Sequence, residues 1–248
     1  MKIIELASHP LAWTAIVVAS LVITHSPEVR AADPFPPVSP EGLQLQKDTT
    51  LRAVYLKPGF TLAPYKRVAI LDCFVQFAPD FQRNYNENEP DLEGQITASE
   101  MTKITTDLAA EFKQVFTQEL QANGGYPVVD SAAPDVLVLR PAIINLVVTA
   151  PDLMTPDMSA TVVSSAGQMT LYLELYDSMA NTLLARVIDP EADDSPMAQA
   201  ADSVTNKMAA DRILRRWADI LRKHLDAVRG QAASSPAAPA PAAAPVAN

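Results

Sequence analysis

Residues 168–176 (QMTLYLELY) alternate strictly between aliphatic side chains and polar or tyrosine side chains, and this pattern constrains the fold most. In a β-strand the aliphatic residues would share one face, because successive side chains point to opposite sides. These residues are Met169, Leu171, Leu173 and Leu175. A strand with one apolar and one solvated face is typical of an antiparallel sheet that is covered on one side only.

Further β-rich runs surround this strand. The polar segment 177–181 leads into the apolar run 183–188, which predicts a hairpin. Residues 66–77 are apolar on both faces over their first half, which indicates a central strand. Pro141 cannot donate a hydrogen bond, so a strand over 136–148 should be an edge strand or be bulged there. Shorter strands are expected over residues 53–57 and 126–130.

Two segments, residues 99–122 and 198–228, repeat apolar residues at helical spacing. Thr97 or Ser99 can cap the first helix, and Asn123-Gly124-Gly125 can end it. The stripe expected to be buried on the second helix is Met208, Leu214, Trp217, Leu221 and Leu225. The element order β-β-α-β-β-β-β-α predicts an α+β fold, a two-layer sandwich of a mainly antiparallel sheet covered by two amphipathic helices.

The two ends of the chain differ from this domain. Residues 1–31 have the pattern of a secretory signal peptide, with an apolar core over Leu11–Ile23 and a cleavage site after Ala31. That core is shorter than the ~20 residues that a bilayer span needs, although an uncleaved anchor is the alternative. A Pro-rich leader (residues 32–40) and a disordered Ala/Pro-rich tail (residues 231–248) flank a single domain over residues 41–230.

Composition argues against nucleic acid as a partner and against a lipid anchor or an internal disulfide. The net charge is −10, and it stays −10 without residues 1–31, so the surface repels nucleic acid. The one cysteine, Cys73, lies far from the signal segment, so we expect no lipid anchor on the mature chain and no internal disulfide. We expect Cys73 to behave as a small buried hydrophobic residue.

Three segments together resemble the domain-of-unknown-function family 3313 of bacterial envelope proteins, many of which are lipoproteins. They are VYLKPGFTLAPYKRVAILD (residues 54–72), LELYDSMANTLLARVID (residues 173–189) and RRWADILRKHLD (residues 215–226). The likeness covers about residues 41–229. It implies a periplasmic or outer-membrane-associated protein with no established activity, and it carries no site residue. The chain departs from the family in lacking the lipid-anchoring cysteine and in its long segment over residues 79–97.

The residues that could support catalysis are few. His224 is the sole histidine after the signal segment, and its basic neighbours favour a solvent-facing helix position. Asp72 shares a strand face with apolar residues, so it is either a desolvated acid or, more simply, the residue at which the strand leaves the core. The acidic loop at residues 189–194 offers oxygen ligands for weak calcium binding, with a plain solvated turn as the alternative. We therefore expect no enzyme, no cofactor and no dedicated metal site.

Two long connections are the candidate partner contacts. Residues 78–97 place Phe81, Tyr85 and Leu92 in an acidic, polar setting, as recognition surfaces often do. The alternative is that Phe81 and Tyr85 fold back onto the sheet. The connection after the 136–148 run carries two further candidates, Met154 and Met158, since methionine adapts to varied surfaces.

These features favour an exported, non-enzymatic protein of the bacterial envelope, an interaction or accessory module whose partners are envelope proteins. The signal segment places it in the periplasm. A periplasmic protein that binds a small ligand or a metal is the first alternative. A hydrolase that uses paired carboxylates is the second, and it would need a groove with two carboxylates about 5–10 Å apart.

Overall fold

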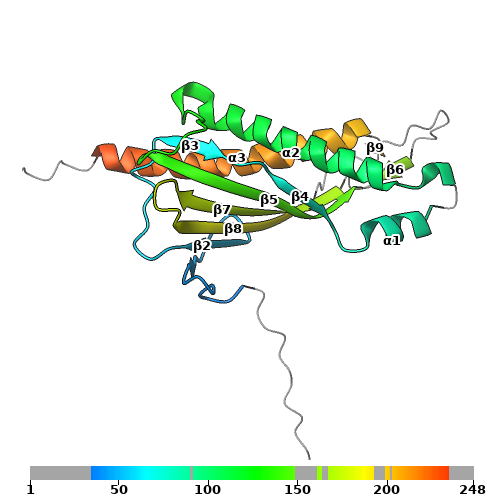
Figure 1. Cartoon of the computed structure of the whole chain (residues 1–248), viewed down its shortest axis with the longest axis horizontal. Helices are drawn as coiled ribbons and strands as arrows, with labels where there is room; N and C mark the ends of the chain where they lie inside the picture. The colour runs from blue at the N-terminus through cyan, green and yellow to red at the C-terminus, as the bar shows by residue number, and fades with distance from the viewer. Residues whose placement is uncertain are drawn as a thin grey trace, which may run out of the picture. The chain divides into compact units, whose positions relative to one another are not determined.

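The computed structural model describes residues 35–89, 92–148, 161–163, 167–192, 199–201 and 203–234 (Figure 1). Three sequence predictions fall outside these residues: the signal peptide, the tail after residue 234, and the contact pair Met154 and Met158.

The described chain is an α+β domain built on a mixed seven-stranded sheet. The strands are β1 (Gln44–Leu45), β2 (Ala53–Leu56), β3 (Arg67–Ile70), β4 (Phe74–Phe77), β5 (Val136–Val148), β6 (Thr161–Val163), β7 (Gly167–Asp177), β8 (Leu183–Ala192) and β9 (Gln199–Ala201). The helices are α1 (Phe81–Glu87), α2 (Ala98–Gln121) and α3 (Ser203–Ser234), with short 3-10 turns at Leu92–Gly94 and Ala122–Gly124. The sheet order is β1-β2-β8-β7-β5-β3, with β4 also paired to β5, while β6 and β9 form a separate pair.

The prediction of one central strand over residues 66–77 is wrong. The segment forms two short strands, β3 and β4, which both pair in parallel with β5 at one edge of the sheet. The expected strand at 126–130 covers that edge through a single bridge between Val68 and Val128. The sheet is therefore antiparallel except for the two pairs that β3 and β4 make with β5.

Pro141 explains the interruption between β3 and β4. The Leu71 N–H donates to the Leu139 carbonyl at 2.9 Å, and the next pair in register is Phe74 with Ala142. Pro141 lies between these two pairings, so the neighbouring strand breaks where β5 has no N–H to offer. The prediction that Pro141 marks an edge strand or a bulge is thus wrong, because β5 is interior and its register shift lies beyond Ile144.

The two long helices lie side by side on one face of the sheet (Figure 1). The sequence-predicted first helix is confirmed in α2, which begins with a capping box between Thr97 and Glu100. The inward row of β7 and the hairpin into β8 are also confirmed. In α3 the stripe contains Leu214, Trp217 and Leu225 as predicted, but Met208 is 56% exposed and Ala209 takes the buried position.

Part of the other face of the sheet is covered by the start of the domain. Leu43, Ala53 and Tyr55 form a second small core there, against which Phe35 packs. The Tyr55 hydroxyl donates to the Pro36 carbonyl at 3.0 Å. The folded unit thus begins at Phe35, inside the expected leader, and α3 continues to Ser234, inside the expected tail.

Candidate ligand-binding cleft

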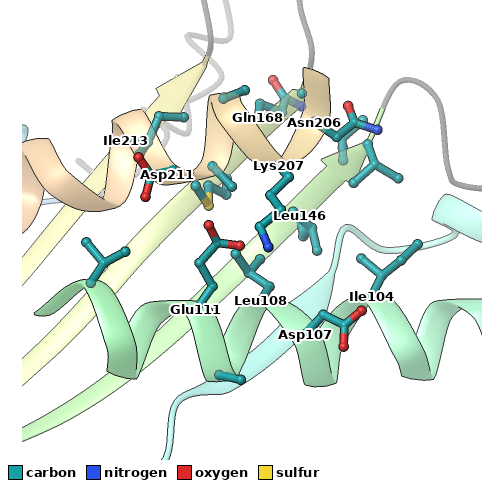
Figure 2. Close-up of a pocket in the computed structure, with 18 of the residues that line it drawn as sticks. Ile104, Asp107, Leu108, Glu111, Leu146, Gln168, Asn206, Lys207, Asp211 and Ile213 are labelled. Atoms are coloured by element: carbon teal, nitrogen blue, oxygen red, sulfur yellow. The ribbon is translucent and has the colours of Figure 1, made fainter. Parts of the chain in front are cut away.

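A cleft of about 720 Å³ lies between α2 and α3, above the ends of β5 and β7 (Figure 2). This volume falls within the ~300–1,000 Å³ typical of sites for small ligands. Its floor consists of buried aliphatic side chains, namely Leu108, Val115, Leu146, Met169 and Ile213. The walls are the facing sides of the two helices, where Ala110 and Ala210 leave room because their side chains are small.

The two helices are held together at the end away from the cleft. The Arg222 guanidinium donates to the carbonyls of Leu120 and Ala122, at 3.1 and 2.8 Å, and so satisfies the C-terminal end of α2. Arg215 adds an ion pair to Glu119 at 2.6 Å. The cleft therefore opens along the halves of α2 and α3 that lack such cross-links among the described residues.

Two of the carboxylates in the cleft already have partners. Asp107 pairs with Lys103 at 2.9 Å, one turn earlier on α2. Asp211 accepts a hydrogen bond from Arg215 at 2.8 Å, one turn later on α3. Each of these pairs lies along one helix, so neither closes the space between the two helices.

Among the described residues that line the cleft, Glu111 and Lys207 are the charged groups without such a partner. Figure 2 shows both side chains extending into the space between the helices. Neither makes a side-chain hydrogen bond or ion pair with another described residue. Partial burial raises the pKa of Glu111, and the nearby positive charge of Lys207 opposes this shift. Among its described charged groups, the cleft thus presents one carboxylate and one ammonium group that have no ion-pair partner within hydrogen-bonding distance, above an aliphatic floor.

The predicted partner contacts lie elsewhere. Phe81 is buried in α1 and stacks on Phe77 with ring centroids 4.8 Å apart, and Tyr85 packs beside it at 5.9 Å. This geometry favours the alternative that these two aromatic residues fold back onto the sheet. Leu92 is 84% exposed and remains available for a partner.

The two candidate residues for acid–base chemistry are both exposed. The Asp72 side chain is 96% exposed and lies 3.4 Å from Lys113, so the desolvated acid considered from the sequence is not formed. Asp72 instead occupies the break between β3 and β4. His224 is exposed on α3, as expected, with its Nδ1 3.0 Å from the Ile220 carbonyl oxygen.

The acidic segment at residues 189–194 is not the solvated loop expected from the sequence, because β8 extends through its first four residues. The Asp189 carboxylate is buried and accepts hydrogen bonds from the Trp217 indole at 2.8 Å and the Arg52 backbone N–H at 2.7 Å. Glu191 pairs with Arg216. Asp193 and Asp194 lie outside the described residues, and no cluster of potential metal ligands occurs in the described part of the chain.

Sequence reasoning missed Glu111, Lys207 and the buried Asp189–Trp217 pair. Glu111 and Lys207 are ordinary polar positions on amphipathic helices, and nothing in the sequence shows that they face each other. Asp189 and Trp217 do carry a signal, since they lie in two of the three segments that resemble family 3313.

The fold and the cleft together define an α+β domain with a candidate site for a small ligand between its two long helices. The model of the family described as "Protein of unknown function (DUF3313)" matches residues 38–221, and the chain belongs to this family. No curated protein matches the chain. Across the described residues, no helix is both long and apolar enough to cross a bilayer.

Several solved structures are similar to the chain at low identity. A PelC dodecamer from Paraburkholderia phytofirmans is 11% identical, with 68% of this chain and 96% of that chain covered and a TM-score of 0.34. Protein XCC0632 from Xanthomonas campestris is 13% identical, with 73% and 94% covered and a TM-score of 0.38. A candidate lipoprotein from Caulobacter crescentus is 14% identical, with 52% and 87% covered and a TM-score of 0.28.

Proposed function

We propose that this protein is an exported, non-enzymatic accessory protein of the bacterial cell envelope that works by binding a small ligand in the cleft between α2 and α3. The observation that carries the proposal is the cleft itself, with its aliphatic floor and the charges of Glu111 and Lys207, which face each other across it and make no hydrogen bond or ion pair with a described side chain. Apolar sites with a few convergent polar groups are where proteins usually bind small molecules. The ligand-binding function, an alternative from the sequence, therefore becomes the first choice.

The charge arrangement supports binding rather than hydrolysis. A carboxylate-based hydrolase needs two carboxyl groups with distinct roles on either side of the bond that breaks. Among the described lining residues, Asp107 and Asp211 are each paired with a cation on their own helix, Lys103 and Arg215, and Glu111 is the carboxylate without such a partner. We accordingly propose that no covalent chemistry takes place there.

The location follows from the sequence. The apolar core at Leu11–Ile23 and the small-residue site at Ala31 direct the chain to the periplasm, where the mature protein begins at Ala32. We also propose that the mature chain carries no lipid anchor, which is supported by the place of its one cysteine, Cys73, far from residue 32 and buried between β3 and β4.

A second candidate function is docking to an envelope protein. Leu71 and Phe74 are 47% and 59% exposed at the break between β3 and β4, and exposed apolar surface is a common feature of contact sites. A photo-crosslinking residue at position 74 should capture an envelope protein in cells if this function operates. Crosslinks that are equally frequent from exposed Ala227 on α3 would argue against it.

The ligand-binding function can be tested without knowing the ligand. The protein purified from periplasm is measured by native mass spectrometry beside Ala110→Trp, which fills the cleft from an exposed helix position. Ala227→Trp is the matched control, since Ala227 is exposed on α3 and does not line the cleft. We expect the wild type and Ala227→Trp to carry a bound mass that is absent from Ala110→Trp. The same spectrum for all three proteins would contradict the proposal.

A further inference from the structure

We propose that the cleft selects a zwitterionic amphiphile, with an aliphatic body on the floor, an ammonium group at Glu111 and an anionic group at Lys207. This inference rests on the proposed function, and it adds the chemical class of the ligand. Two observations support it. The floor of the cleft is aliphatic, and Glu111 and Lys207 make no ion pair with another described residue.

The floor is suited to an aliphatic body. The side chains that form it are leucine, isoleucine, valine and methionine, and the described lining contains no aromatic residue. Flexible aliphatic side chains, and methionine above all, adapt to an alkyl chain, and its burial would remove apolar surface from water. Aromatic ligands would lack ring partners here.

The charges select the head group. An occupant of the floor excludes water from Glu111 and Lys207, and a charge that loses water without gaining a partner is costly. A singly charged amphiphile would pair one of these groups and leave the other unpaired. A zwitterion pairs both. Asp107 and Asp211 each have a cation one turn away on their own helix, Lys103 and Arg215, so Glu111 is the carboxylate best placed to take the ligand's ammonium group.

Two sources share this chemistry. One is an amino acid or peptide terminus with an aliphatic side chain, and the other is a phospholipid with an ethanolamine head group. In both, an ammonium group and an anionic group lie close together at one end of an aliphatic body, as the facing positions of Glu111 and Lys207 require (Figure 2).

Titration calorimetry with four short probes tests the proposal. Octylamine carries the cation alone, octanoate carries the anion alone, and α-aminooctanoate and a short-chain lysophosphatidylethanolamine carry both. We expect at least one zwitterion to bind about tenfold or more tightly than either singly charged probe, since hydrogen bonds to charged groups are the strong ones. The tighter of the two zwitterions identifies the source.

Two variants assign the charges. Glu111→Gln should remove the advantage of the zwitterion over octanoate, and Lys207→Gln should remove its advantage over octylamine. Glu87→Gln and Lys223→Gln make the same chemical changes at exposed positions outside the cleft and should change neither ratio.

The outcomes separate this inference from the proposed function. Equal affinity for all four probes, lost in Ala110→Trp, would overturn the zwitterion inference and leave ligand binding in place. If no probe binds but the native mass spectrum shows a bound mass that Ala110→Trp lacks, the zwitterion inference is overturned and ligand binding stays in place. Absence of both would overturn the inference and the proposed function together.

Discussion

The hydrogen bonds of Asp189 make a sharp stability prediction. Asp189 is only 4% exposed, and its carboxylate joins three parts of the domain: β8, which carries it, Trp217 on α3, and the Arg52 backbone just before β2. Both partners are N–H donors. Asp189→Asn keeps the size of the side chain but replaces one acceptor oxygen by an NH₂ group, which can only donate. One of the two donors must therefore lose its partner.

The magnitude follows from the burial of this site. A hydrogen bond to a charged group contributes about 1.5–3 kcal/mol, and a buried donor left without an acceptor costs about 1–3 kcal/mol. Removing a buried charge offsets part of that loss. We expect a net destabilisation of about 2 kcal/mol, judged from these two ranges. For a domain of this size, roughly 2–4 °C per kcal/mol converts this to a fall in Tm of roughly 4–8 °C.

The assay is urea unfolding followed by tryptophan fluorescence, because Trp217 is the one tryptophan outside residues 1–31. The midpoint should fall with an unchanged slope, since the surface exposed on unfolding stays the same. Asp219→Asn is the control on α3, where the carboxylate is half exposed and pairs with Lys223. It should change the free energy of unfolding by less than about 0.5 kcal/mol. An equally small effect of Asp189→Asn would refute the reasoning.

Three further predictions concern other contacts. Gly125→Ala should destabilise by about 1–3 kcal/mol, because its Cβ would clash with a backbone carbonyl and a guanidinium, whereas Gly230→Ala on α3 has free space and should be neutral or stabilising in the same unfolding assay. Burial raises the pKa of Cys73 from 9.0 to about 12, so at about pH 8 the folded protein should react with a thiol reagent roughly a thousandfold more slowly than the unfolded chain. The Arg186 guanidinium lowers the pKa of Glu41 from 4.5 to about 2, so this contact stabilises the fold fully above about pH 4.5 and is lost as the pH falls through about 2. Measured against pH, the Tm of Glu41→Gln should lie below that of the wild type at neutral pH and approach it only at the lowest pH, as Glu41 becomes protonated in the folded protein.

The parts of the fold that could be predicted from the sequence are those set by local periodicity. The alternation in residues 168–176 identified the inward row of β7, and the helical repeat with Thr97 before it identified α2 and its cap. Each of these patterns depends on residues that are neighbours along the chain, so no knowledge of distant pairing is needed.

The features that could not be predicted from the sequence depend on contacts between residues that are far apart along the chain. The apolar run at residues 66–77 resembled a central strand because both its faces are covered, yet it pairs with β5 at the sheet edge and breaks opposite Pro141. The run of acidic residues around Asp189 predicts a solvated loop, whereas its carboxylate is buried against Trp217 and Arg52, which are distant in sequence. The cleft also depends on residues that are distant in sequence, since Glu111 and Lys207 form one site only because α2 and α3 lie side by side.

Binding in the cleft is tested most directly by NMR of methyl-labelled methionine. Met169 is buried in the floor of the cleft, whereas Met179 is exposed in the turn between β7 and β8 and serves as the internal control. Titration with α-aminooctanoate, short-chain lysophosphatidylethanolamine or any ligand released from the purified protein should shift the Met169 methyl signal saturably and leave that of Met179 in place. An unchanged Met169 signal under conditions in which the ligand binds, or equal and unsaturated shifts of both methyl groups, would contradict the account.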